Sequence, residues 1–127
     1  MEACLRFFDS NGAWHTADEE ESVFPRLAPG LKPQERAFIE KLEGQHREAE
    51  QVYSDLRRVA RELRDAETIA PVLIADYTQT VARLCRLYRA HIHSEDQTLI
   101  ELGRRLLDRA ALSAISSEMK RRRSLSR

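Results

Sequence analysis

The sequence predicts an all-α protein, a bundle with three long helices and a short C-terminal helix. Three observations support this fold class. Glycine and proline number only four each among 127 residues, and 33% of the residues are charged, as in helices with one solvated face. Apolar residues recur at steps of three and four along most of the chain. No segment alternates apolar and polar residues as a strand does.

The helix-breaking residues divide a single predicted domain, residues 1–127, into its helices. Pro29 and Gly30 end the first helix, which we expect to break near Gly12, and Pro33 opens the second. Pro71 suits an early position of the third helix. The four predicted helices cover residues 1–27, 33–66, 69–107 and 111–123.

Each long helix carries an apolar stripe that is interrupted by a histidine. The stripe of the second helix consists of Ile39, Leu42, His46, Ala49, Tyr53, Leu56, Ala60 and Leu63. His15 and His91 interrupt the stripes of the first and third helices in the same way. His93 lies off the stripe of its helix, and we interpret it as a surface residue.

A glutamate follows each of these three histidines by four residues. The pairs are His15 and Glu19, His46 and Glu50, and His91 and Glu95. On a helix this spacing places both side chains on one face, with Cβ atoms about 5–6 Å apart, so both can reach one metal ion. Burying imidazole and carboxylate groups is costly unless each finds a partner, which a metal ion provides. Nitrogen and oxygen ligands without thiolate suit iron, manganese or zinc.

Two simpler interpretations remain open at this point. A core histidine is usually just hydrogen-bonded, and a glutamate one helical turn away is usually solvated. Glu50 in particular lies in the charged run Arg47–Glu50, which could be an exposed shoulder of its helix. The basic run Lys120–Arg123 is interpreted as a solvated helix end that complements the helix dipole.

The chain resembles the bacterial hemerythrin-like, HHE cation-binding domains. The matching segments are His15–Leu27, Glu43–His46, His91–Asp96 and the tail Ile115–Arg123. The resemblance implies an up-and-down four-helix bundle that holds an oxo- or hydroxo-bridged non-haem di-iron centre. It further implies that Glu19 and Glu95 bridge the metals and that the three stripe histidines are terminal ligands. Glu50 matches a position that carries a further ligand in some members.

The resemblance also indicates that a helix is absent. The family's first helix, with a histidine of its own, would precede the segment that starts at Met1. We therefore expect an exposed apolar face, which a second copy of the chain or another partner would cover. The other explanation is a truncated or mis-started product of a longer polypeptide.

The expected function is the binding of O2 or a related small ligand, or iron or oxygen sensing or storage. The alternatives are a metal-free bundle that acts as a protein-interaction module, and a di-iron oxidase or peroxidase-like enzyme. Nothing in the sequence marks a substrate pocket, so enzyme activity is the less favoured interpretation.

The composition limits the partners that we expect and the cellular location of the protein. With 21 basic and 21 acidic residues, bulk attraction to nucleic acid is not expected. The longest apolar run, Pro71–Ala75, is far too short to span a membrane. Two cysteines and no signal peptide fit a cytoplasmic protein.

Overall fold

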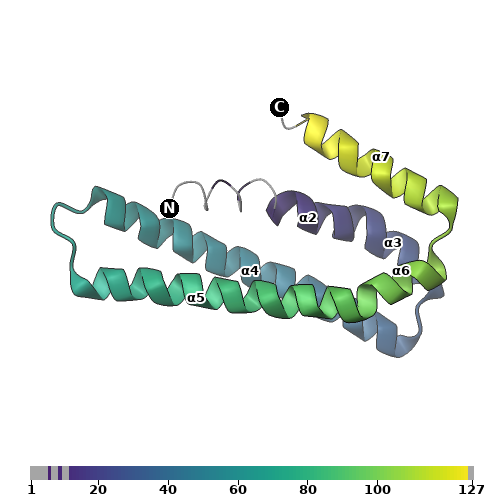
Figure 1. The fold of residues 1–127 in the computed structure, drawn as a ribbon, viewed down its shortest axis with the longest axis horizontal. Coiled ribbons are helices and arrows are strands. Elements are labelled where there is room, and N and C mark those ends of the chain that lie inside the picture. Colours follow the sequence, from purple (N-terminus) through teal and green to yellow (C-terminus); the bar gives the residue numbers. More distant parts are fainter. Residues whose placement is uncertain (1–5, 7–8, 10–11, 126–127) are drawn as a thin grey trace. The chain divides into compact units, whose positions relative to one another are not determined.

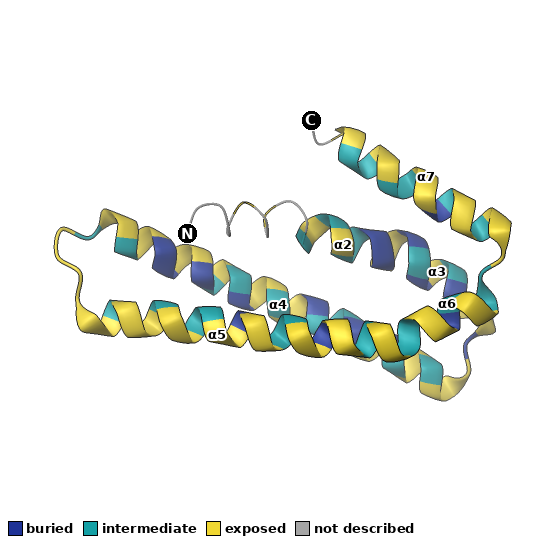
Figure 2. Ribbon diagram, viewed as in Figure 1, coloured by how far each residue is buried: buried dark blue, intermediate teal, exposed yellow. Residues whose placement is uncertain are grey.

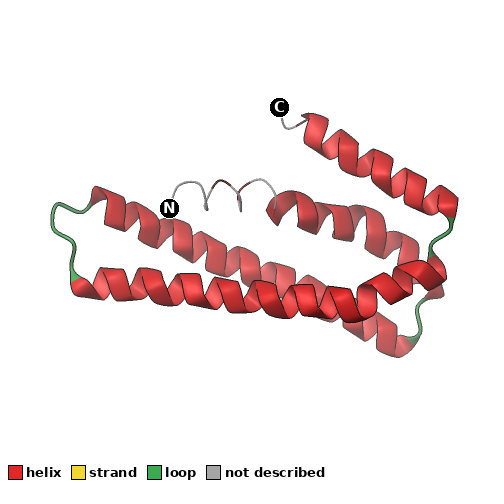
Figure 3. Ribbon diagram, in the orientation of Figure 1, coloured by secondary structure: helices red, strands yellow, loops and turns green. Residues whose placement is uncertain are grey.

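The computed structural model describes Arg6, Asp9 and residues 12–125. Its secondary structure over these residues is helical, without a strand, which confirms the all-α prediction (Figure 3). The rest of the predicted first helix before Gly12 lies outside the described residues. No helix in the described part of the chain is long and apolar enough to cross a membrane.

The chain folds as two compact units. The first unit consists of residues 1–43 and 94–127, and the second consists of residues 44–93. The helical elements, labelled in Figure 1, are α2 (Ala13–Ala17), η2 (Asp18–Val23), α3 (Phe24–Leu27), η3 (Ala28–Gly30), α4 (Pro33–Asp65), α5 (Pro71–Ser94), η4 (Glu95–Leu99), α6 (Ile100–Leu106) and α7 (Arg109–Leu125). The segments η2 and η4 are π-helical, and η3 is a short 3₁₀-helix.

Local capping explains where two helices of the first unit begin. Pro33 is the first residue of α4, and the backbone N–H of Lys32 donates to Glu35 Oε2 at 2.7 Å. This contact satisfies an N–H that has no partner within the helix. At the start of α7, Asp108 Oδ1 accepts a hydrogen bond from the backbone N–H of Ala111 at 2.8 Å.

The core of the first unit joins α3 to the start of α4 and to α6. Its buried residues are Phe24, Leu27, Leu31, Ile39, Leu42 and Leu102. Gly30 permits close packing against α6, because a Cβ atom at this position would lie 2.8 Å from Leu106 Cδ2. The glycine that was expected to end the first helix therefore also makes room for a side chain of another helix.

The second unit is a helical hairpin. Residues 44–65 of α4 run antiparallel to residues 71–93 of α5, and residues 66–70 connect them (Figure 1). The buried apolar residues of the hairpin are Val52, Leu56, Val59, Ala60 and Leu84. Most of α5 is exposed or half-buried, and its exposed apolar residues include Val72 and Ile74 (Figure 2).

Candidate metal centre

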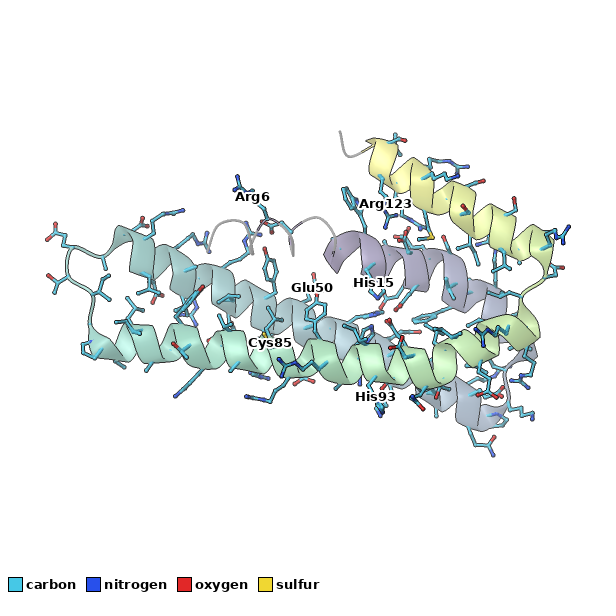
Figure 4. The ribbon with its side chains drawn as sticks, viewed as in Figure 1. Arg6, His15, Glu50, Cys85, His93 and Arg123 are labelled. Atoms are coloured by element: carbon cyan, nitrogen blue, oxygen red, sulfur yellow. The ribbon has the colours of Figure 1, made fainter. Side chains whose placement is uncertain are left out.

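Three of the candidate ligands meet at one nitrogen atom in the first unit. The Nε2 atom of His15 lies 3.0 Å from Glu19 Oε1 and 2.9 Å from Glu95 Oε1. The ligand atoms that these residues offer all lie within 4.8 Å of one another. His15, labelled in Figure 4, comes from α2. Glu19 comes from η2, and Glu95 comes from η4. The structure thus brings together the glutamates of two histidine–glutamate pairs that are far apart in the sequence.

Both glutamates lie in π-helical segments. Glu19 is the second residue of η2, and Glu95 is the first residue of η4. Short π-helical segments within α-helices are rare, and they occur frequently at functional sites. Each segment immediately follows the α-helical turn that carries the histidine of its motif, so the local backbone changes between histidine and acid in both motifs.

The electrostatics of this cluster favour a charged histidine in the metal-free protein. The hydrogen bonds to Glu19 and Glu95, in that order of strength, raise the pKa of His15 from 6.5 to about 10. The Glu19 residue is only 5% exposed, whereas the side chain of His15 is 48% exposed. An imidazolium between two carboxylates is therefore the resting arrangement, and a metal ion has to displace its proton.

The second unit holds a pair of buried histidines. His46 of α4 and His91 of α5 are both buried, and their Nε2 atoms lie 3.0 Å apart. The Nδ1 atom of His91 lies 2.9 Å from Gln45 Oε1, an acceptor, so Nδ1–H is the donor. In this tautomer the lone pair of His91 is on Nε2, the nitrogen that faces His46, and a histidine binds a metal through such a lone pair.

The remaining candidates differ in position. His91 lies four residues before Glu95, across the junction of α5 and η4, and its role as a ligand stays a prediction. The side chain of Glu50 is exposed, and its role as a ligand stays a prediction. His93 is also exposed, which agrees with its interpretation as a surface residue (Figure 4).

Two residues that adjoin candidate ligands, Gln45 and Asp18, were not predicted from the sequence to support the site. Gln45 precedes His46 directly, but an amide gives no periodic signal, and its contact with His91 depends on the hairpin. Asp18 precedes Glu19 and is buried, with Arg122 and Arg123 of α7 as its partners. The interpretation of the basic run as a solvated helix end is wrong for these two arginines.

The donor set fits a metal of the iron, manganese or zinc type. The ligand atoms are imidazole nitrogens and carboxylate oxygens, and the cysteine among the described residues, Cys85, is exposed on α5. Carboxylate and histidine ligands on facing helices are the usual way in which a helical bundle holds such metals. The chemistry of these residues therefore points to cation binding.

The comparisons with known proteins agree with this geometry. A family model described as the hemerythrin HHE cation binding domain matches residues 1–102. No curated protein and no solved structure matches the chain. The matched residues include α2 to α5, η4 and all three histidine–glutamate pairs. The chain belongs to the hemerythrin HHE cation-binding domain family.

Proposed function

We propose that this protein holds a non-haem di-iron centre and binds O2, or a related small oxidant, reversibly. The observation that carries the proposal is the convergence of Glu19 and Glu95 on the Nε2 atom of His15. Two carboxylates within reach of the same position are what a bridging role between two metals requires. The same ligands would serve iron or oxygen sensing, or iron storage.

The proposed ligands divide into two roles. Glu19 and Glu95 would bridge the metals, and His15, His46 and His91 would be terminal ligands. Glu50, one turn beyond His46 on α4, would be a further ligand. When bound, the iron pair supplies the electrons and the open coordination position for the small oxidant.

The residues of the chain prepare the site in three ways. His15 gives up its proton so that Nε2 can bind a metal, and the two adjacent carboxylates then neutralise part of the cation's charge. Gln45 Oε1 accepts from Nδ1–H of His91 and so selects the tautomer whose lone pair is on Nε2. The burial of His46 and His91 limits the access of water to their nitrogens.

The first test is metal analysis of protein produced with added iron. Anaerobic reconstitution with ferrous iron, followed by absorbance spectra after air exposure and after reduction, should show bound iron whose spectrum changes reversibly. Absence of metal after reconstitution would contradict the proposal and favour a metal-free interaction module. Steady turnover of a peroxide or an organic substrate would identify an enzyme instead.

Two further parts of the proposal concern the environment of the protein. We place the protein in the cytoplasm, because its cysteine usage fits a reducing compartment. We also propose a homodimer, in which a second copy covers exposed apolar side chains such as Val72 and Ile74. Light scattering on the sample used for metal analysis tests this, and a metal-loaded monomer would contradict the dimer.

A further inference from the structure

The C-terminal helix α7 lies beyond the residues that the family model matches, yet it packs on the segment that carries Glu19. The contact joins α7 to α2 and η2, within the first unit. Arg123, labelled in Figure 4, also places its guanidinium 5.4 Å from the ring centroid of Trp14 on α2. The polar partners of this contact indicate what α7 does.

Asp18 is the central acceptor of the contact. Arg123 binds it with both terminal nitrogens, Nη2 to Oδ2 at 2.8 Å and Nη1 to Oδ1 at 3.3 Å. Arg122 Nη1 adds a third hydrogen bond to Oδ1 at 2.8 Å. Asp18 is only 4% exposed, so its charge is compensated by these two arginines rather than by water.

A second ion pair, between Arg26 and Glu118, extends the contact with α7 by about one helical turn. Arg26 binds both carboxylate oxygens of Glu118, Nη1 to Oε1 at 3.0 Å and Nη2 to Oε2 at 2.7 Å. The hydroxyl of Ser22, which is buried between them, donates to Glu118 Oε1 at 3.2 Å and also contacts Arg122. Asp18, Ser22 and Arg26 thus form a row with four-residue spacing that faces α7. We call this set of contacts, with its partners Glu118, Arg122 and Arg123, the α7 clamp.

The α7 clamp begins at the residue before a candidate metal ligand. Asp18 and Glu19 are the first two residues of η2, so a displacement of Asp18 moves the backbone from which Glu19 projects. A π-helical turn is less favourable than an α-helical turn and needs support from its surroundings. The bidentate contact between Asp18 and Arg123 supplies such support, because it fixes direction as well as distance.

We propose that α7 positions Glu19 for metal binding, with Asp18, Arg122 and Arg123 as positioning residues that contact no metal themselves. This inference rests on the proposed metal site. Its consequence is that a helix outside the matched family region determines the affinity and the coordination geometry of the metal. Changes in residues that support metal ligands typically alter metal affinity by roughly ten- to a hundredfold.

The test compares two double variants of the full chain. Arg122→Ala with Arg123→Ala, the clamp variant, removes both arginine partners of Asp18. Lys120→Ala with Arg121→Ala removes the same charge from exposed positions of the same helix. The probe is Co²⁺, which accepts nitrogen and oxygen ligands and has a visible spectrum that reports coordination geometry. Anaerobic titration gives the Co²⁺ affinity, and circular dichroism gives the helix content of each protein.

We expect the clamp variant to bind Co²⁺ at least about tenfold more weakly than the wild type and with an altered visible spectrum. The control variant should stay within about twofold of the wild type. Arg123→Lys keeps the charge but not the bidentate geometry, and its Co²⁺ affinity should lie between those of the clamp variant and the control variant. If the double variant does not fold, Arg123→Lys should still bind Co²⁺ more weakly than the control variant.

Different results would contradict the role of α7 and the proposed metal site. A folded clamp variant with the wild-type affinity and spectrum would overturn the role of α7 and leave the metal site intact. An Arg123→Lys variant indistinguishable from the wild type would overturn it as well. A wild-type chain that binds no Co²⁺ would overturn the proposed metal site and the inference together.

Discussion

The Nε2 atom of His15 lies 2.9 Å from the carboxylate of Glu95, although 80 residues separate them in the sequence. The same nitrogen lies 3.0 Å from Glu19, one helical turn away. One imidazole thus contacts the glutamates of two of the chain's histidine–glutamate pairs. With its pKa raised to about 10, His15 places a positive charge between the two carboxylates.

Metal-free protein should therefore show an unusually basic histidine. Its two glutamate partners raise the pKa of His15 to about 10, so it should remain protonated at pH 8. Because the pKa is raised on folding, the stabilisation is fully present below pH 6.5 and is lost as the pH rises through about 10. Titration by NMR, with His15→Gln to assign the signal, measures this value. A midpoint near 6.5 would contradict the arrangement.

Metal affinity should increase with pH for the same reason. Below the pKa of His15 a bound metal displaces one proton from this residue, which contributes about a tenfold gain in affinity per pH unit. Co²⁺ titrations between pH 6 and 8 measure the slope in the wild type and in His15→Gln. The variant should have a slope lower by about one proton. Equal slopes would show that His15 releases no proton on metal binding.

Gln45 should matter for metal binding without being a ligand. Gln45→Leu removes the acceptor of the His91 Nδ1–H, which should weaken Co²⁺ binding roughly tenfold. Leaving this donor without its acceptor should also cost about 1–3 kcal/mol of unfolding free energy. Gln45→Glu keeps an acceptor and should retain most of the affinity. Gln51→Leu, at an exposed position of the same helix, is the matched control. A Gln45→Leu variant with unchanged affinity would contradict this role.

The apolar core of the first unit should dominate its stability. Leu27 is 0% exposed, and Leu27→Ala should cost about 2–5 kcal/mol through lost burial and the remaining cavity. Leu125→Ala, at the exposed end of α7, should change the unfolding free energy by about 0.5 kcal/mol or less. Urea denaturation measures both. Equal effects of the two substitutions would contradict the observed packing.

The sequence was sufficient to predict the fold class and the starts of some helices, because these depend on local signals. The three- and four-residue periodicity predicted helices, and Pro33 opens α4 as expected. The third predicted helix starts at Pro71 rather than at residue 69, because residues 66–70 form the connection of the hairpin.

The sequence was sufficient to nominate ligand residues for the candidate site, but not to predict the backbone conformation or the supporting contacts around them. The four-residue spacing of His15 and Glu19 identified a motif, and the family resemblance joined it to Glu95. The π-helical turns at both acids were not predictable, because the same residues would also fit an α-helix and packing decides between the two. The clamp at Asp18 was missed because a basic run at a helix end carries no sign of its partner.

The most direct test of the account is the iron content of the variant Glu19→Ala with Glu95→Ala after anaerobic reconstitution. Glu20→Ala with Asp96→Ala is the matched control, since each of these exposed acids lies next to one of the proposed ligands. We predict about two irons per chain in the wild type and in the control, and none in the ligand variant. Full iron occupancy in the folded ligand variant would contradict the account.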